Sequence, residues 1–569
     1  MKTEARFLLA VVLMLGVLVG TNRLFPPTVP EVVESLEDST VAAKPGQGAA
    51  TPDIPGLPAV TSGETVAPGA SVTEALSTLP VETTVEVEGP LYRYVFTTRG
   101  AQAQVVELTQ FEALNRDGVV DLIPEGAGGY LGSKLVVGAD TVDLTNVPFR
   151  VEPADGVRLT EGGGEESLRF VYEHPTSEFE FEVVYTFNPS HYTVGVSGGV
   201  RGVERPLLVT DLGEGLAYAE ADSALEARAM AYVHNHLQEG IQSTLLSKSE
   251  PTVIEGPLVW TAFRSKFFVA ALLAGDSSEA TSDESYLGGL IVRESVLSER
   301  VRVGAAQSVG TDGRFSFRLF MGPQEYAVLS DLGQGMEEVN PYGWKVFRPI
   351  VRPIVSVIMT VLVFLHTQLS LGYGWVLIVF GVAMRVVLFP LNHKAMKAQL
   401  RNMSVQPLVK EIQDRYKDQP EKLQKEMMGL YKEHGFNPLA GCLPMLLPWP
   451  VLIALFFVFQ NTIELRGVSF LWLPDLSAKD PLYILPMILA VSMFLMQWVS
   501  LRSLDQENPQ MKMMMYIMPP MMLFIFINLA SGLNLYYATA NIATLPQQIW
   551  IARERKKMKG HPPLTLSRE

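Results

Sequence analysis

The chain has 569 residues, of which 48% are hydrophobic, and carries a formal net charge of −15 at pH 7. This length allows several domains, and so apolar a composition at an acidic balance argues against an ordinary soluble protein. The charge is unevenly divided: residues 341–569 hold 23 Lys and Arg against 13 Asp and Glu, which leaves 22 against 47 in residues 1–340. The single cysteine, Cys442, excludes an intramolecular disulfide framework and any multi-cysteine metal site. We therefore expect an acidic soluble part joined to a basic membrane part, without a cofactor or a metal.

The first residues have the pattern of an export signal. Lys2 and Arg6 precede an apolar run at 7–19, and neither an Ala-x-Ala cleavage site nor a lipid-accepting cysteine follows. We predict an uncleaved transmembrane signal anchor at 1–25 with its N-terminus in the cytoplasm; a signal peptide cleaved at a weak Leu-Val-Gly site is the alternative. Residues 26–80 are rich in Pro, Ala, Gly, Ser and Thr without a sustained period, and predict a disordered, exported linker.

Residues 81–340 change to an alternation of apolar and polar side chains. The alternation is clear at 92–96 and 179–187, and Arg-Gly, Asp-Gly and Asn-Pro pairs separate the runs. This pattern predicts a large antiparallel β domain, a sandwich. We interpret His191 as a loop residue, because no paired-His or Glu-x-x-His spacing accompanies it. A catalytic pair of carboxylates remains open, although nothing in the sequence selects one.

Residues 341–370 contain an apolar run at 354–365, and its twelve residues are short for a membrane span. We predict an interfacial amphipathic helix on the outer face of the membrane. The distribution of basic residues supports this placement through the positive-inside rule. If the run does not cross, the loop 464–480 lies outside with two Lys and Arg, and nineteen lie in the cytoplasmic segments 1–6, 392–437, 502–512 and 553–569.

Five apolar stretches follow and predict membrane spans, which together with the anchor make six: 374–391, 443–463, 483–501, 513–529 and 533–551. Arg385 interrupts the first of them. At 1.5 Å per residue it lies ~16 Å from one flank and ~13 Å from the other, which is deep for a side chain that only snorkels to the interface. A buried arginine costs about 2.5–3.5 kcal/mol on insertion scales, so we expect it to face water, a partner or the protein interior. Snorkelling is the alternative.

A cytoplasmic insert at 392–437 separates the first two of these spans. Met396, Leu400 and Met403 share one helical face, and a second apolar stripe, Leu423, Met427 and Leu430, follows Gln419-Pro420. These spacings predict two amphipathic helices in a hairpin. The apolar stripes are the contact between the paired helices on the simpler interpretation, and a docking surface for the ribosome or lipid head groups on the other. The tail 553–569 is basic and suits the same partners.

The second half of the chain contains five motifs in a fixed order: GFNPLAGCLP at 435–444, IELR at 463–466, FLWLPDL at 470–476, DPLYILP at 480–486 and GLNLYY at 532–537. Their order and spacing resemble those of the YidC membrane protein insertases of Gram-negative bacteria. The match is specific over about 340–552. The β domain resembles the family's periplasmic domain more loosely, through 98–100, 187–192 and 342–344.

The resemblance implies a polytopic α-helical membrane protein with a five-helix insertase core at 371–552 and a periplasmic β-sandwich domain. Family members are not enzymes; they insert and fold inner-membrane proteins, alone or with the Sec translocon (SecYEG, SecDF), and the ribosome and lipids are further partners. Both termini would be cytoplasmic. The family's groove has a single basic residue that matches Arg385, and the other candidate groove residues are Gln460, Gln497, Asn528, Asn534, Tyr536 and Tyr537. Helix–helix hydrogen bonds or plain interface packing are the alternatives for these side chains.

The chain departs from the family pattern at two positions. Pro448 stands where a Gln is usual, and Asn534 stands where an apolar residue is usual. A solute transporter or channel in which Arg385 binds an anion is the competing function, but it predicts more intramembrane charge and internal repeats. An anchored β-sandwich hydrolase is a third class, and it would not need six spans.

Overall fold

The computed structural model describes residues 82–128, 130–275, 286–295, 300–340, 347–390, 411–412, 415–416, 419–433, 449–502 and 509–558. The chain divides into two compact units. The first unit is Phe25–Asn340, and the second unit is Met1–Leu24 together with Pro341–Glu569. The predicted anchor and the whole predicted linker lie outside the described residues, as do most of the cytoplasmic hairpin, Cys442, Pro448 and the end of the tail.

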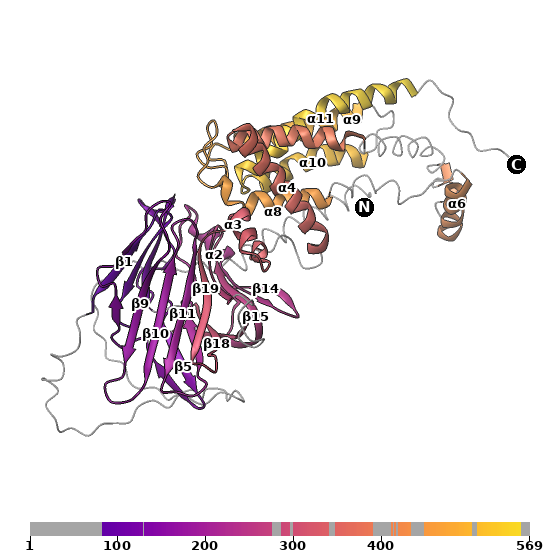
Figure 1. The fold of residues 1–569 in the computed structure, drawn as a ribbon. Helices are drawn as coiled ribbons and strands as arrows, with labels where there is room; N and C mark the ends of the chain where they lie inside the picture. Colours follow the sequence, from indigo (N-terminus) through magenta and orange to yellow (C-terminus); the bar gives the residue numbers. More distant parts are fainter. Residues whose placement is uncertain are drawn as a thin grey trace, which may run out of the picture. The chain divides into compact units, whose positions relative to one another are not determined.

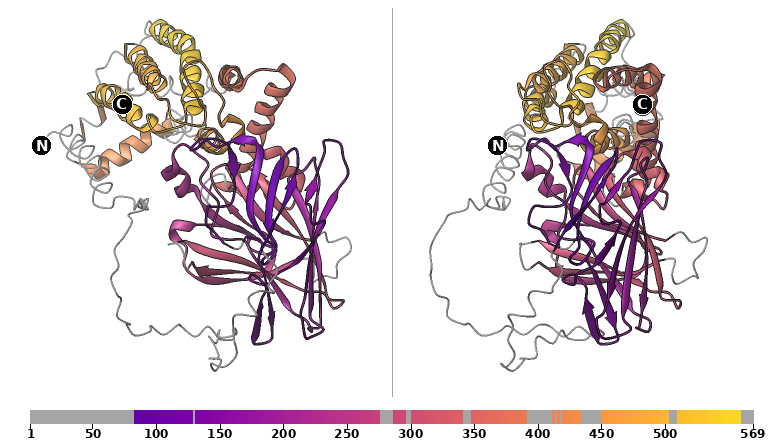
Figure 2. Two further views of the ribbon diagram at one scale, coloured as in Figure 1. Left: turned by 90° about the vertical axis from the view of Figure 1, so that its left-hand side faces the viewer. Right: turned by 60° about the vertical axis from the view of Figure 1, so that its left-hand side comes forward.

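The first unit is built from two β-sheets, whose long strands run side by side in Figures 1 and 2. The five-stranded sheet has the order β4-β3-β2-β1-β8, with β1 Thr84–Glu88, β2 Tyr92–Thr97, β3 Gln102–Glu112, β4 Val119–Asp121 and β8 Val157–Arg158. The fourteen-stranded sheet has the order β6-β5-β12-β18-β17-β15-β16-β19-β11-β10-β9-β7, with the β13–β14 hairpin attached to β15. Its strands are β5 Ser133–Val137, β6 Asp140–Asp143, β7 Arg150–Glu152, β9 Glu166–Glu173, β10 Glu180–Phe187, β11 Thr193–Arg201, β12 Leu207–Asp211, β13 Ala231–His236, β14 Gly240–Leu245, β15 Thr252–Arg264, β16 Phe268–Ala274, β17 Leu287–Glu294, β18 Val301–Ser308 and β19 Arg314–Pro323.

Alternating burial explains how the two sheets pack. In β10, every second side chain from Phe181 to Phe187 is buried and its neighbours are half-buried, because successive side chains of a strand point to opposite faces. Phe96 of the smaller sheet meets Tyr185 and Phe170 of the larger sheet with ring centroids 4.9 and 5.6 Å apart. The inner faces therefore meet in an aromatic core. The expected β-rich domain is confirmed, and His191 lies exposed in the turn between β10 and β11.

Short helices complete the first unit: α2 Ser223–Ala229, α3 Tyr326–Leu332, and the 3-10 turns η2 Leu246–Lys248 and η3 Met336–Glu338. The second unit is helical. Its elements are α4 Arg348–Leu369, the helix Tyr373–Pro390, α6 Pro420–Glu433, α8 Trp449–Asn461, η4 Ile463–Leu465, α9 Ile484–Arg502, α10 Pro509–Phe526 and α11 Ser531–Met558.

Helix α4 corrects the expected length of its segment. It has 22 residues instead of the twelve-residue apolar run, because Pro349 is accommodated in the first turn, where its missing N–H is not needed. Within the described residues, Pro349–Leu369 and Tyr373–Pro390 are long and apolar enough to cross a membrane. The argument from a short run therefore fails, and the outer-face placement of α4 stays a prediction that depends on the charge distribution.

Candidate functional site

Arg385 lies in the helix Tyr373–Pro390, and its side chain is half-buried. It lines a cavity of about 520 Å³ between this helix and the second half of α11, together with Val382, Val386, Phe389, Ala543, Pro546, Gln547 and Trp550. The guanidinium Nε is buried and has no hydrogen-bond partner within the described part of the chain. Among the residues that the structure describes, no carboxylate forms an ion pair with Arg385. Within the described part of the chain, the site is thus a cation without a neutralising partner on the wall of an otherwise mostly apolar cavity.

Two of the predicted tyrosines lie near this cation. Arg385 is close enough to Tyr536 and Tyr537 of α11 to interact with both electrostatically. A glycine permits the approach of the two helices, since a Cβ added at Gly381 would lie 3.3 Å from Thr539 Cγ2 and 3.5 Å from the Tyr536 carbonyl oxygen. Gly381 has no side chain, so α11 can pack close to this helix at that point.

Tyr536 and Tyr537 differ in their surroundings. Tyr536 is buried, and its ring packs 5.7 Å from Phe380 and 5.5 Å from Phe459 of α8. Tyr537 is half-buried and its ring contacts Phe526 of α10 at 5.4 Å. The position of Tyr536 is therefore that of a core aromatic, whereas Tyr537 keeps partial access.

The other predicted residues are spread over the helical unit. Asn534 is fully buried; its Nδ2 donates to the Phe526 carbonyl at 2.9 Å, and its Oδ1 is buried without a partner in the described residues. Gln460 is half-buried directly after Phe459, Gln497 is half-buried on α9, and Asn528 is exposed between α10 and α11. None of these four side chains lines the cavity at Arg385.

The cavity walls include residues that sequence reasoning missed. Gln547 and Trp550 are one helical turn apart on α11 and face Arg385, as their i, i+3 spacing on one helical face permits. The sequence signal for these two residues was a glutamine one helical turn before a tryptophan. Near the end of a predicted span, the same pattern also occurs in ordinary pairs at the membrane–water interface, so it did not select them. Hydrogen bonding between helices also joins Asn541 of α11 to Ser492 of α9, with Nδ2 to Oγ at 3.3 Å.

The other end of α11 is fixed by the loop that precedes α9. The Ser531 amide donates to the Ala478 carbonyl at 2.6 Å, and the Gly532 amide donates to the Leu476 carbonyl at 2.8 Å. These bonds satisfy amides in the first turn of the helix, which have no partner within it. The loop therefore holds the start of α11.

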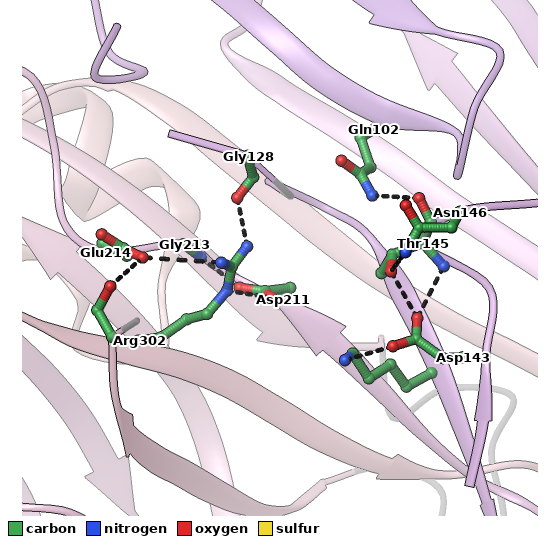
Figure 3. Close-up of polar contacts among 11 residues, drawn as sticks. Gln102, Gly128, Asp143, Thr145, Asn146, Asp211, Gly213, Glu214 and Arg302 are labelled. Carbon is green, nitrogen blue, oxygen red and sulfur yellow. Dashed lines mark hydrogen bonds and ion pairs between the residues drawn. The ribbon is translucent and has the colours of Figure 1, made fainter. Parts of the chain in front are cut away.

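In the β unit, a partly buried ion pair joins β12 to β18 (Figure 3). Arg302 Nε lies 2.6 Å from Asp211 Oδ2, and the Gly213 amide donates to Asp211 Oδ1 at 2.7 Å. Burial raises the pKa of the Asp211 carboxyl above its usual range, although Arg302 and the Gly213 amide act in the opposite direction. Glu214 completes the group at 3.7 Å from Arg302 Nη1. Its contacts are those of a structural network, and no cluster that could hold a metal is found among the described residues.

Comparisons with known proteins agree with the sequence motifs. The family described as 60Kd inner membrane protein matches residues 364–559, and the YidC periplasmic domain family matches residues 84–357. Membrane protein insertase YidC of Chlorobium luteolum is 31% identical over 522 residues, covering 85% of this chain and 84% of the relative. The protein of the same name from Chlorobaculum tepidum is 30% identical over 508 residues, covering 84% and 83%.

A crystal structure of an active YidC insertase with its first transmembrane domain resolved aligns over 82% of this chain and 94% of that chain, at 19% identity and a TM-score of 0.33. That score is too low to carry an argument. The family assignment depends on the sequence relatives, which match both units and span most of the length of each protein. The chain belongs to the YidC family of membrane protein insertases.

Proposed function

We propose that this chain inserts and folds inner-membrane proteins, and that Arg385 receives the hydrophilic segment of the substrate during insertion. The observation that carries the proposal is the isolated cation: Arg385 lines a cavity, its Nε has no hydrogen-bond partner, and no ion pair neutralises it among the described residues. An arginine kept for helix packing would be expected to pair with a carboxylate or a carbonyl.

The mechanism follows from the balance of charge and burial. An acidic exported segment would pair with Arg385 while the apolar segment of the substrate moves along the helices into lipid. The charge–charge contact lowers the cost of holding polar residues at membrane depth, and burial of the apolar segment drives the step toward lipid. The membrane potential adds about 2.3 kcal/mol per charge per 100 mV where a substrate charge crosses. No nucleotide is required in this scheme.

The positions of the other proposed groove residues support a role in the groove to different degrees. Tyr537 has the most, because it is partly accessible and close to Arg385. Gln460, Gln497, Asn528 and Asn534 would line other parts of the path, and Tyr536 would support the wall through its aromatic contacts. Gln547 joins the proposed groove because it lines the same cavity as Arg385.

We further propose six spans, with the N-terminus and the C-terminus cytoplasmic, the 81–340 domain periplasmic and α4 on the periplasmic membrane surface. The boundaries predicted from the sequence are kept: 1–25 for the anchor, 26–80 for the linker, 341–370 for the interfacial segment, 371–552 for the core, 392–437 for the hairpin and 553–569 for the tail. SecYEG and SecDF would be partners for part of the substrates, and the ribosome would contact the hairpin and the basic tail.

The test is insertion of a single-span substrate with an acidic exported tail into proteoliposomes that hold only this protein. Arg385→Ala is compared with Arg385→Lys and with Val387→Ala, a control on the same helix whose side chain is 68% exposed and does not line the cavity. A lost charge-assisted contact is worth about 1.5–3 kcal/mol, so the alanine variant is expected to insert roughly 10–150-fold more slowly. The lysine and control variants should remain close to wild type.

Two outcomes contradict parts of the proposal. If wild type inserts nothing until SecYEG is added, independent insertion of this substrate is wrong. If wild type and Arg385→Ala insert equally fast, the electrostatic role of Arg385 is wrong for this substrate, whereas the insertase function stands. Making the tail neutral should slow wild type and leave Arg385→Ala unchanged, since the alanine variant has already lost the contact.

A further inference from the structure

The loop between η4 and α9 has a tight turn with an apolar residue at its tip. The Phe470 amide donates to the Leu473 carbonyl at 2.8 Å, and the Leu473 amide donates to the Phe470 carbonyl at 2.9 Å. These two bonds close a two-residue turn made of Leu471 and Trp472. Leu471 has a φ of +54°, and its side chain is 73% exposed. The left-handed region is strained for a leucine and is normally left to glycine, asparagine or aspartate.

A second residue of the same kind lies at the other end of the loop. Tyr483 precedes α9, has a φ of +57° and is 47% exposed, and its neighbour Leu482 is 60% exposed. Turn positions with positive φ usually carry small or polar side chains. This loop therefore displays large apolar and aromatic side chains at both of its strained positions, at a conformational cost that a polar turn residue would avoid.

One buried carboxylate holds both positions. Asp480 has no exposed surface; its Oδ1 accepts from Trp472 Nε1 at 3.2 Å and from the Leu482 amide at 3.0 Å, and its Oδ2 accepts from the Leu485 amide at 2.7 Å. The Tyr483 amide donates to the Asp480 carbonyl at 3.2 Å. Hydrogen bonds to an ionised acceptor are among the stronger ones in proteins. The exposed side chains are consequently presented by a fixed frame and not by a loose loop.

The display is continuous with the outer ends of two membrane helices. Phe470 is buried and its ring meets Trp375, edge to face at 5.5 Å. Trp375 is 54% exposed in the first turn of the helix Tyr373–Pro390, and Ile484 begins α9 and is 36% exposed. Leu473 and Leu476 of the same loop are buried and already form its core. The exposed apolar residues of the loop are therefore additional to that core.

We infer that Leu471, Trp375, Leu482 and Tyr483 form an anchor that inserts into the outer leaflet of the lipid bilayer at the boundary between head groups and acyl chains. This inference rests on the spans proposed above. Lipid is the occupant, because Trp375 and Tyr483 lie at the starts of two apolar helices proposed to cross the membrane, because Leu471 follows Phe470, whose ring packs on Trp375, and because aromatic residues concentrate at that boundary. Exposed clusters of large apolar residues are otherwise rare on protein surfaces facing water. The anchor fixes the depth at which the outer loop, and the start of α11 bound to it, lie in the membrane.

The test uses site-directed spin labels, since the chain has one cysteine to remove. In a Cys442→Ser background, full-length protein in lipid nanodiscs carries a nitroxide at Leu471→Cys, at Leu482→Cys or at Ser469→Cys, a matched position in the same loop with an exposed polar side chain. Collisions with oxygen, which partitions into lipid, and with a water-soluble nickel chelate report the depth of each label. Labels at 471 and 482 are expected about 5–10 Å into the boundary between head groups and acyl chains, whereas the label at 469 remains accessible to nickel.

Two results overturn the inference. A label at 471 as accessible to nickel as the label at 469 means that the tip lies in water. A label at 471 protected from both reagents means that protein, such as another part of this chain or a second copy, covers it in place of lipid. A second variant protects the test against misfolding of the cysteine at the tip: Leu471→Asn tolerates the left-handed backbone but is polar, and it is expected to move a label at 482 toward water. An unchanged depth at 482 would also contradict the anchor.

Discussion

Gly374 offers a sharp test of how the loop between η4 and α9 is held against the helix Tyr373–Pro390. A Cβ added at this position would lie 2.1, 2.3 and 2.8 Å from Cδ2, Cγ and Cε2 of the Phe470 ring. Phe470 cannot simply turn away, because its ring packs against Trp375 and its backbone closes the turn with Leu473. We therefore expect Gly374→Ala to displace the loop from the start of the helix.

The expected magnitude follows from two opposing terms. Overpacking of a well-packed contact costs about 1–3 kcal/mol, while alanine in place of glycine favours a helix by up to about 1 kcal/mol. The net effect should be a loss of roughly 1–2 kcal/mol in the stability of the loop against the helices, a factor of about 5–30 in its opening equilibrium. Gly372→Ala is the control, since an added Cβ meets no atom within 4 Å there.

Hydrogen exchange measured by mass spectrometry in lipid nanodiscs reports this opening directly. Amides of 468–478 should exchange about 5–30-fold faster in Gly374→Ala than in wild type, and the β unit should be unaffected. Gly372→Ala should exchange like wild type. Equal exchange in all three proteins would refute the claim that the ring is fixed, and equal acceleration in both variants would show that the loop responds to any change at this end of the helix and not to the contact with Phe470.

Three further predictions concern buried polar groups. Arg302→Gln leaves the Asp211 carboxylate without its guanidinium and should destabilise the β unit by about 3 kcal/mol in a denaturant titration. This is the lower end for a buried pair, because the Arg302 side chain is 30% exposed. The control Arg314→Gln removes an ion pair whose arginine is 83% exposed, and it should cost under about 1 kcal/mol in the same titration. Burial lowers the pKa of His234, so the unfolded chain takes up a proton as the pH falls through about 6.5 while the folded chain resists it, and stability is lost in that window. His234→Gln should lessen this loss, and an unchanged pH profile would refute the assignment. Asp480→Asn removes a charged acceptor of three donors and should destabilise the outer loop by about 1–3 kcal/mol, as faster amide exchange.

The β unit was predictable because its signal is local. Residues 179–187 alternate in the sequence, and the same alternation appears as burial in β10. The pairing partners were not predictable: β10 lies between β9 and β11, but β11 pairs on its other side with β19, more than a hundred residues later in the chain. Period-two patterning specifies which face is buried, whereas strand order depends on long-range packing that no short window contains.

The apolar run at 354–365 is shorter than α4 for a physical reason. Counting apolar residues ended the run at the basic and proline residues before Ile354, although Pro349 fits a first helical turn and Pro353 is accommodated inside the helix. A composition count measures how much of a helix can face lipid, and this is not the length of the helix. The left-handed backbone conformation of Leu471 and Tyr483 could not be predicted from the sequence either, because neither residue type indicates positive φ.

The candidate site shows where sequence reasoning ends. Arg385 could be selected from sequence alone because one charge in an apolar run has a cost that must be met by something. Which residues meet it depends on the rotation of α11 about its axis, and a small rotation exchanges one set of facing residues for the next. Both Tyr536 and Tyr537 were groove candidates from the sequence, and the family motif favoured Tyr537. In the structure Phe380 and Phe459 pack against Tyr536 and turn its ring into the core, and the same rotation of α11 brings Gln547 to the cavity. The polar lining of a membrane groove is thus a property of helix packing, while its charge is a property of the sequence.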